Sequence, residues 1–202
     1  MLKPCKVNYF LLFGQTLKIK NHVLFCPSRF LAYLRKPKQT DMNDFIHLHV
    51  HTYYSILDGQ SKISKLVDKA IADDMKGMAI TDHGAMFGIK EFVDYCAGIN
   101  KKRKAEGLAP FKPIIGCEMY VARHRLQDKV KENGDNSGYH LIVLAKNYKG
   151  YKNLIKLVSK SWIDGYYYRP RTDRVELEKY HEGLIICSAC IAGEIPSKIL
   201  HD

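Results

Sequence analysis

The sequence of 202 residues contains no apolar run that approaches the ~20 residues of a membrane-spanning helix, so we expect no membrane partner. Its six cysteines show no spacing typical of a disulfide framework, which favours a reducing, cytoplasmic compartment. Cys187 and Cys190 form a C-x-x-C pair, but no second pair at zinc-ribbon spacing accompanies them. No G-x-x-x-x-G-K-[ST] segment is present, which argues against P-loop nucleotide chemistry.

Positive charge is concentrated at the beginning of the chain. The formal net charge is +11, a value that often indicates a nucleic acid or anionic partner. Residues 1–41 hold eight of the 32 lysines and arginines but one of the 21 acids, which leaves 24 bases against 20 acids in residues 42–202. The leader is either a basic arm, an unusual targeting segment, or an over-extended reading frame before Met42. We favour the last interpretation. The small positive surplus of residues 42–202 is then weak support for a nucleic-acid partner of that part of the chain.

Three histidines alternate in the segment 45–59, FIHLHVHTYYSILDG. In an extended strand His47, His49 and His51 share one face, and apolar residues occupy the other. Two imidazoles at positions i and i+2 converge on one ion without distortion, and imidazole is a common zinc ligand. The alternative is a half-buried strand whose polar face meets water, but the triplet beside Asp58 favours a metal.

The rest of the body alternates strands and helices. We expect a helix capped by Ser61, a strand over 78–80 that ends in Thr81-Asp82-His83-Gly84, and a helix over 87–106. Strands over 114–121 and 139–145 follow, joined by a surface loop over 123–138. Asn147 is expected to cap a helix whose inner face comprises Tyr151, Leu154, Ile155, Val158 and Trp162, and a strand over 183–187 follows it. This alternation, without repeats, predicts an α/β fold with a parallel barrel or open sheet.

Glu118 interrupts an otherwise apolar strand. A carboxylate there is costly unless it is paired or ligated, so metal ligation is favoured over an edge strand that faces water. Donor side chains from five segments are expected to gather at one rim: His49, His51, Asp58, Asp82, His83, Glu118, His140 and Cys190. These are too many for one four-coordinate ion, which predicts a cluster of two or three ions. Such a cluster suits phosphoester hydrolysis, with Asp58, Asp82 and Glu118 as the catalytic candidates.

The segment 165–171, GYYYRPR, places three aromatic residues before two arginines. Arg169 and Arg171 could bind phosphates while the tyrosines stack on bases. A structural turn with surface tyrosines is an equally good interpretation. We treat His124, at the edge of the preceding loop, as an ordinary surface histidine.

Five segments together resemble the PHP (polymerase and histidinol phosphatase) domain at the amino terminus of bacterial DNA polymerase III alpha subunits. They are HLHVHTYYSILDG, ITDHG, IIGCEMYVA, YHLIVLAKNYKGYKNLIKLVSKSWIDGYYYRPR and GLIICSACIAGEIP. The resemblance implies a distorted α/β barrel, incomplete because the chain ends early, with up to three zinc, manganese or magnesium ions. It implies as metal ligands His49, His51, Asp58, His83, Glu118, His140 and Cys190. Asp82 belongs to its Asp-His motif, and His47 receives no ligand role.

Two features of the resembled family are missing. The chain contains no Asp-x-His, the motif that closes the family's metal site, and no polymerase palm, fingers or thumb. We therefore expect residues 42–202 to be the first part of a PHP domain and residues 1–41 to be foreign to it. The implied parent is a DNA-directed DNA polymerase with primer–template DNA, replisome subunits and a proofreading exonuclease as partners.

Three functions follow from the resemblance. The first is a metal-dependent phosphoesterase, specifically a 3′–5′ exonuclease that proofreads. The second is a catalytically silent scaffold that docks a separate exonuclease. The third is a phosphatase of the histidinol-phosphate type, which the GYYYRPR segment disfavours.

Overall fold

The computed structural model describes residues 45–134, 136 and 138–201, with only the backbone at residue 201. The chain divides into two units, Met1–Thr40 and Asp41–Asp202, and every described residue belongs to the second. The basic leader and the start at Met42 lie outside the described residues, so those interpretations stay predictions. Among the described helices, none has the length and apolarity that a bilayer crossing requires.

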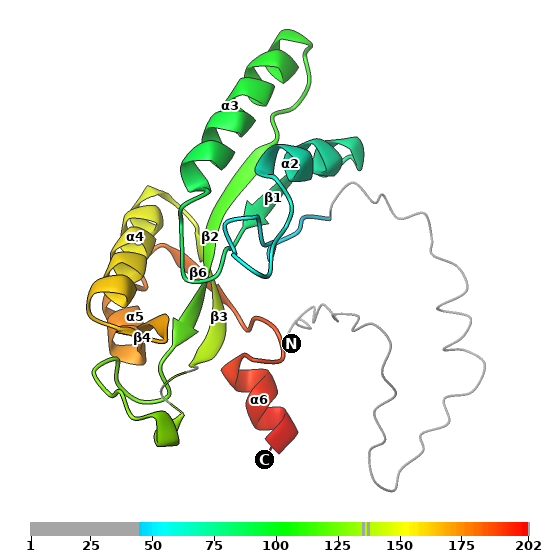
Figure 1. Ribbon diagram of the computed structural model, residues 1–202. Helices are drawn as coiled ribbons and strands as arrows, with labels where there is room; N and C mark the ends of the chain where they lie inside the picture. The colour runs from blue at the N-terminus through cyan, green and yellow to red at the C-terminus, as the bar shows by residue number, and fades with distance from the viewer. Residues whose placement is uncertain (1–44, 135, 137, 202) are drawn as a thin grey trace, which may run out of the picture. The chain divides into compact units, whose positions relative to one another are not determined.

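Strands and helices alternate through the described part of the chain (Figure 1). The strands are β1 (Gly77–Ile80), β2 (Lys112–Val121), β3 (Tyr139–Ala145), β4 (Tyr166–Tyr167), β5 (Arg169–Thr172) and β6 (Leu184–Cys187). The helices are α2 (Ile63–Ala72), α3 (Ile89–Ala105), α4 (Tyr148–Ile163), α5 (Arg174–Tyr180) and α6 (Glu194–His201), with a 3₁₀ turn η2 (Lys131–Asn133). The predicted α/β class is confirmed.

The sheet is mixed, so the expectation of a parallel sheet is wrong. Its strand order is β4-β5-β2-β3-β6, and β1 also pairs with β2. Strand β2 runs parallel to β1 and β5 but antiparallel to β3, and β3 runs antiparallel to β6. The described residues of the connection over 122–138 include the short turn η2 and no longer helix, whereas a parallel pair needs a longer crossover, usually a helix. Strand β3 therefore returns antiparallel beside β2.

The two faces of β2 have different roles because side chains alternate along a strand. Cys117 and Met119 are buried against Leu154 and Leu157 of α4, in a cluster that also includes Val143 of β3. Residues of the opposite parity, among them Glu118, are therefore directed to the other face of the sheet. A second cluster joins α2, α3 and β1 through Ile63, Val67, Phe92, Cys96, Met78 and Ile80.

The helix ends follow local capping chemistry only in part. Asn147 caps α4 as predicted, and its Oδ1 accepts a hydrogen bond of 2.9 Å from Gly150 N. The predicted cap at Ser61 is wrong, because α2 begins after Lys62 and has no side-chain cap. The predicted inner face of α4 is also partly wrong: Ile155 and Trp162 are 39% and 43% exposed, while Leu157 and Ser161 are buried.

Candidate metal centre

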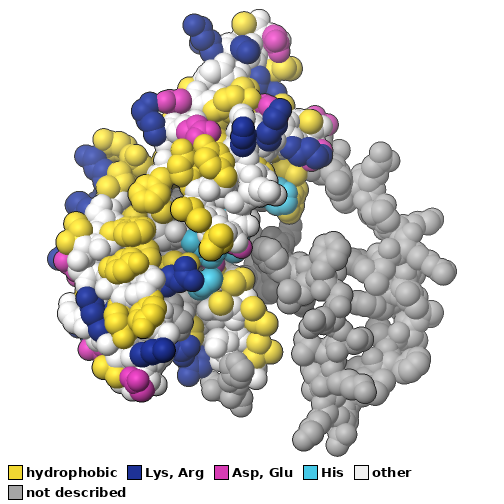
Figure 2. Space-filling view, in the orientation of Figure 1, with side chains coloured by type: hydrophobic (Ala, Val, Ile, Leu, Met, Phe, Trp, Pro, Cys, Tyr) yellow, Lys and Arg dark blue, Asp and Glu magenta, His cyan; other side chains and the backbone are white. Residues whose placement is uncertain are grey.

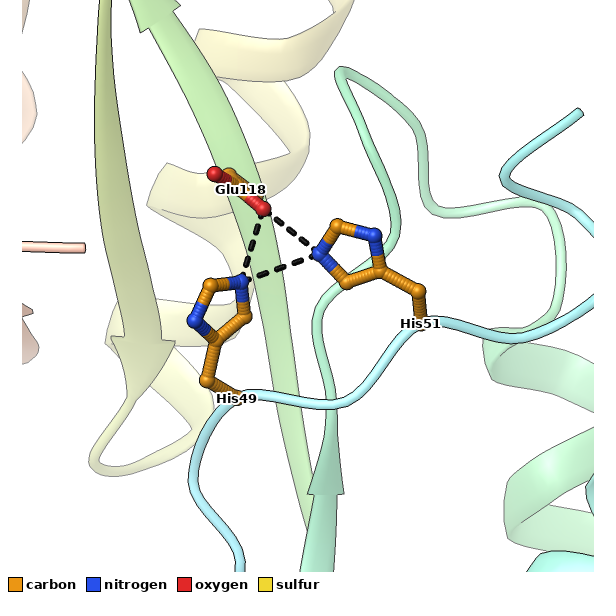
Figure 3. Close-up of side chains that lie close together, drawn as sticks. All are labelled: His49, His51 and Glu118. Carbon is orange, nitrogen blue, oxygen red and sulfur yellow. Dashed lines mark hydrogen bonds and ion pairs between the residues drawn. The ribbon is translucent and has the colours of Figure 1, made fainter. Parts of the chain in front are cut away.

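The segment that carries the histidine triplet is extended but is not a regular strand, which corrects the prediction. It follows β1 through hydrogen bonds of 2.8 Å from Ala79 N to His47 O and from Thr81 N to Val50 O. The predicted alternation nevertheless holds for His49 and His51, whose rings turn toward the same point (Figure 3). Their Nε2 atoms lie 3.0 Å apart, and both contact one carboxylate oxygen of Glu118.

Glu118 lies at the centre of the site. The residue is 1% exposed, so the alternative of an edge-strand carboxylate in water does not apply. Its Oε2 lies 2.8 Å from His49 Nε2 and 2.6 Å from His51 Nε2, and its Oε1 lies 2.7 Å from His140 Nδ1. Burial alone would raise the pKa of this carboxyl, but hydrogen bonds from these three imidazoles outweigh burial and hold the pKa far below its usual range.

Asp58 and His83 extend the site beside His51, and the ring of His83 also lies 5.3 Å from the ring of His140. Asp58 Oδ2 contacts His51 Nδ1 and lies 3.1 Å from His83 Nε2. The hydrogen bond from His51 is the largest cause that lowers the pKa of Asp58. Burial is the largest influence on both histidines: it lowers the pKa of His83, whereas in His51 bonds to Glu118 and Asp58 overcome it and raise the pKa.

These donors form three overlapping groups among the described residues, each with its ligand atoms within 4.8 Å of one another. The groups are His49/His51/Glu118, His51/Asp58/His83 and His83/Glu118/His140. One ligand atom in these groups makes no hydrogen bond: His83 Nδ1 is buried and lies 3.6 Å from Glu118 Oε2. A buried ring nitrogen without a partner among nitrogen and carboxylate donors fits a divalent metal ion.

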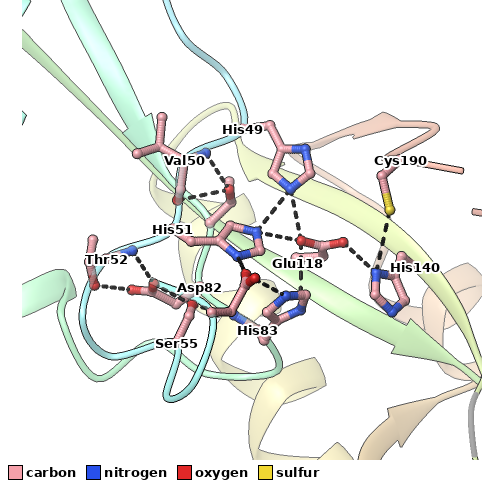
Figure 4. A network of polar contacts seen from close by, with 12 residues as sticks. His49, Val50, His51, Thr52, Ser55, Asp82, His83, Glu118, His140 and Cys190 are labelled. Carbon is pink, nitrogen blue, oxygen red and sulfur yellow. Dashed lines mark hydrogen bonds and ion pairs between the residues drawn. The ribbon is translucent and has the colours of Figure 1, made fainter. Parts of the chain in front are cut away.

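Asp82 does not join this cluster, although the sequence analysis includes it among the catalytic candidates. Its carboxylate is buried and turns to the loop that follows His51 (Figure 4). It accepts hydrogen bonds of 2.7 and 2.8 Å from Thr52 N and Oγ1, and one of 2.6 Å from Ser55 Oγ. The Ser55 hydroxyl in turn accepts a 3.1 Å bond from His83 N. Asp82 therefore braces the loop that carries Asp58.

The remaining predicted ligand, Cys190, lies at the margin. Its Sγ is 3.7 Å from His140 Nδ1, and the residue is exposed and outside the three donor groups. His47 lies outside the three donor groups, with its ring 4.7 Å from the ring of Phe45. His124 is exposed on the loop after β2.

The two arginines of the GYYYRPR segment have different environments. Arg169 is exposed and lines a cavity of about 610 Å³ beside the donor cluster, together with Asp58, His83, Tyr120, Arg123 and His140. Arg171 is fully buried, and its guanidinium donates hydrogen bonds of 3.0–3.1 Å to the carbonyl oxygens of Gly165, Leu126 and Asp128. Its burial is incompatible with the expected contact to a phosphate, and Arg171 instead ties β5 to neighbouring loops.

Three residues of the site carry no role in the sequence analysis. Tyr120 stacks on His83 with ring centroids 5.7 Å apart, and Thr52 and Ser55 hold Asp82. Strand parity could have indicated Tyr120, because it lies two residues after Glu118 and shares its face. No sequence signal distinguishes Ser55 from other loop serines.

Comparison with known proteins identifies the family of the chain. The PHP domain family matches residues 47–202, which is most of the chain. The chain belongs to this family. The PHP match covers every donor residue described above and leaves the basic leader unmatched.

Curated relatives of the PHP chain are much longer proteins. The DNA polymerase III subunit alpha of Borreliella burgdorferi is 51% identical over 156 residues, which cover 77% of this chain and 13% of that protein. The subunit of Treponema pallidum is 46% identical over 156 residues, 77% of this chain and 12% of its own. The chain thus spans about an eighth of the length of these relatives.

A solved structure of a metal-dependent phosphoesterase from Bifidobacterium adolescentis also overlaps the PHP chain. The overlap has a TM-score of 0.34 at 21% identity and covers 57% of this chain and 32% of that one. A similarity this weak carries no argument about the chemistry of the site.

Proposed function

We propose that this chain is part of a replicative DNA polymerase alpha subunit whose PHP domain hydrolyses DNA phosphodiesters from the 3′ end. The observation that supports hydrolysis most strongly is Glu118, a buried carboxylate with the imidazoles of His49, His51 and His140 on its two oxygens. A buried carboxylate in contact with three imidazoles from two other segments of the chain is a costly arrangement for a merely structural purpose.

Two or three divalent ions, drawn from zinc, manganese and magnesium, are the cofactors of this proposal. Their ligands are His49, His51, Asp58, His83, Glu118 and His140, with Cys190 as an additional donor beside His140. Ions in such a cluster lower the pKa of water and neutralise charge on phosphate oxygens. Glu118, which contacts three of the imidazoles through its two oxygens, would hold the ions together with these histidines.

The chain's own residues supply positioning. Asp58 holds the rings of His51 and His83 on one side of the site, and Asp82 fixes the loop from which Asp58 projects. Arg169 lines the adjacent cavity and is placed to hold a phosphate of the substrate. Arg171 has no part in this proposal, because its side chain is buried.

The activity of the longer protein belongs to the same proposal. Similarity to DNA polymerase III alpha subunits supports a cytoplasmic replication protein that acts on primer–template DNA with other replisome subunits. A proofreading exonuclease is a further candidate partner. Residues 42–202 form the PHP part, and residues 1–41 are foreign to it.

The test measures bound metal by elemental mass spectrometry and trimming of a 3′-mismatched primer. It uses this chain and a longer polypeptide that adds an Asp-x-His segment. For the longer polypeptide we expect at least two equivalents of bound metal and metal-dependent trimming. The trimming should be lost in His49→Ala and Glu118→Ala but kept in His124→Ala.

Each other outcome selects a different function. Bound metal without trimming would leave the domain as a scaffold. Turnover of small phosphomonoesters but not of DNA ends would indicate a phosphatase of the histidinol-phosphate type. Equal metal content in all three variants would refute the ligand set.

A further inference from the structure

Three aromatic side chains form an exposed row beside the metal centre. Phe87, Trp162 and Tyr166 are 64%, 43% and 48% exposed. The ring of Trp162 lies 6.1 Å from that of Phe87 and 5.7 Å from that of Tyr166, to which it is nearly parallel at 24°. Figure 2 shows hydrophobic side chains gathered over α4 on the face that also exposes histidines. Apolar side chains that lie together at the surface are a feature of binding surfaces.

The aromatic row is joined directly to the site. Trp162 Nε1 donates a hydrogen bond of 2.7 Å to the carbonyl of Gly84, the residue after His83. Gly84 has φ +59°, and a Cβ there would lie 2.5 Å from Pro170 Cγ, so β5 packs closely against this turn. Trp162 of the aromatic row is therefore hydrogen-bonded to the residue that directly follows His83, a proposed metal ligand.

Arg169 occupies the border between the row and the cavity. Its guanidinium lies 5.6 Å from the ring centroid of Tyr120, and that ring stacks on His83. Its neighbour Pro170 pairs with Tyr166 across the β4–β5 hairpin. Of the acids around the cavity, Asp58 contacts His51 and His83, while Lys160 Nζ lies 2.9 Å from Asp164 and 3.8 Å from Glu176.

We propose that Phe87, Trp162 and Tyr166, with Arg169, form a track for the single-stranded 3′ end of a nucleic acid. The bases stack on the rings, and Arg169 holds a phosphate at the entrance to the cavity. Duplex DNA is a poor occupant, since its bases already stack on one another. A protein would use the rings but has no need of a guanidinium at the mouth of a phosphoesterase cavity. The track rests on the proposed function and names its substrate class.

The chain has a single tryptophan, so Trp162 reports on the track directly. The experiment titrates a 12-nucleotide oligothymidylate into the chain in EDTA, where hydrolysis cannot occur, and records tryptophan emission. We expect saturable quenching that weakens with added salt, and much weaker quenching by a blunt duplex of equal length.

Two variants keep the reporter and remove the track. Tyr166→Ala is expected to weaken oligothymidylate binding at least about fivefold, the low end for loss of one stacking ring. Arg169→Ala is expected to weaken it by at least as much, because it loses a charged contact to a phosphate. Tyr148→Ala and Arg174→Ala are matched controls, because both residues are exposed but lie outside the aromatic row. The controls should bind as the unaltered chain does, and far-UV circular dichroism checks that all four variants fold.

The outcome separates this inference from the proposed function. Quenching without any metal-dependent trimming would leave the track standing and remove the nuclease. Trimming with unchanged KM in Tyr166→Ala and Arg169→Ala would remove the track and the phosphate contact proposed for Arg169, and would leave the nuclease. Absence of quenching at low salt, or equal weakening in the controls, would also overturn the track.

Discussion

Asp82 shows how a carboxylate next to a cluster of donor side chains can act without entering it. Its two oxygens accept three hydrogen bonds from Thr52 and Ser55, and all of these groups are buried. The loop they fix carries Asp58, which contacts His51 and His83. Asp82 thus acts on the metal centre through the conformation of residues 52–58.

We predict that Asp82→Asn destabilises the chain and loosens the centre. An amide cannot accept at both of its positions, so at least one buried donor loses its partner, and the free energy of unfolding should fall by about 1–3 kcal/mol. Metal affinity should fall by about 10–100-fold, as it does when a group that orients ligands is removed. Urea denaturation and metal titration measure the two effects.

The control for this variant is Asp94→Asn, which removes an exposed carboxylate paired with Lys90 on α3. It should change neither quantity by more than a few tenths of a kcal/mol. If Asp82→Asn kept its stability and metal affinity yet lost hydrolysis, the carboxylate would have to act in the chemistry itself.

The residues of the site differ in how far sequence could predict them. Alternation along the chain indicates that His49 and His51 act together, and the cost of a lone charge in an apolar strand identifies Glu118. Arg171 could not be placed in this way, because its acceptors at Leu126 and Asp128 lie in a loop distant in sequence. Burial of a cation by carbonyl oxygens leaves no local pattern.

Among the secondary-structure elements, prediction succeeds where a segment is long and periodic. The predicted strand over 139–145 has the bounds of β3, and the predicted helix over 87–106 exceeds α3 by at most two residues at each end. The hairpin of β4 and β5 was not predicted as strands, since Tyr166–Tyr167 is too short for an alternation to show. Helix α5 was missed too, although Asp173 begins it with an ordinary N-cap.

Asp173 gives α5 a dependence on pH that can be measured. Its buried carboxylate caps the helix at Glu176 N, accepts from Leu126 N at 3.1 Å, and pairs with Arg125 Nε at 2.8 Å. Burial alone would raise the pKa of this carboxyl, but the hydrogen bonds and the ion pair outweigh it and lower the pKa. The ionised form therefore stabilises the fold above the pKa of the unfolded chain, about 3.9.

We predict that in Asp173→Asn the free energy of unfolding differs less between acid and neutral pH than it does in the unaltered chain. At pH 7 the variant should be less stable by about 1 kcal/mol or more, since it loses the charged cap. The stabilisation by Asp173 is lost as pH falls through its lowered pKa, so below about pH 4 the two proteins should converge. Urea denaturation at a series of pH values measures the difference in free energy of unfolding between the variant and the unaltered chain. The contributions of other titrating groups are the same in both proteins and cancel in this difference. A gap that stayed constant down to pH 3 would contradict the lowered pKa.

At the scale of the whole described unit, the donor cluster joins segments that few backbone hydrogen bonds connect to one another. His49 and His51 lie on an extended segment with few backbone bonds, His83 follows β1, and Glu118 and His140 lie on β2 and β3. The sequence indicates the ligands but not this connectivity, because the antiparallel return of β3 depends on the connection over 122–138. Tyr120 and His140 are cross-strand partners only in that register.

Metal binding should therefore stabilise the fold as well as supply chemistry. An ion that binds only the folded chain adds about 2.7 kcal/mol when its concentration is a hundred times its Kd. In a chain of this size that corresponds to a rise in Tm of about 5–10 °C. We predict that EDTA lowers Tm by this amount in differential scanning calorimetry and that zinc or manganese restores it.

The matched variant for this measurement is Glu118→Gln, which keeps the shape of the side chain but removes the charge that three histidines contact. Its Tm should be the same with EDTA and with added metal, whereas His124→Ala should respond as the unaltered chain does. Because Tm is read without substrate, the result does not depend on whether the domain is a nuclease or a scaffold. A Tm of the unaltered chain that is insensitive to both chelator and metal would show that the six donors hold no ion, and the hydrolytic proposal would fail with them.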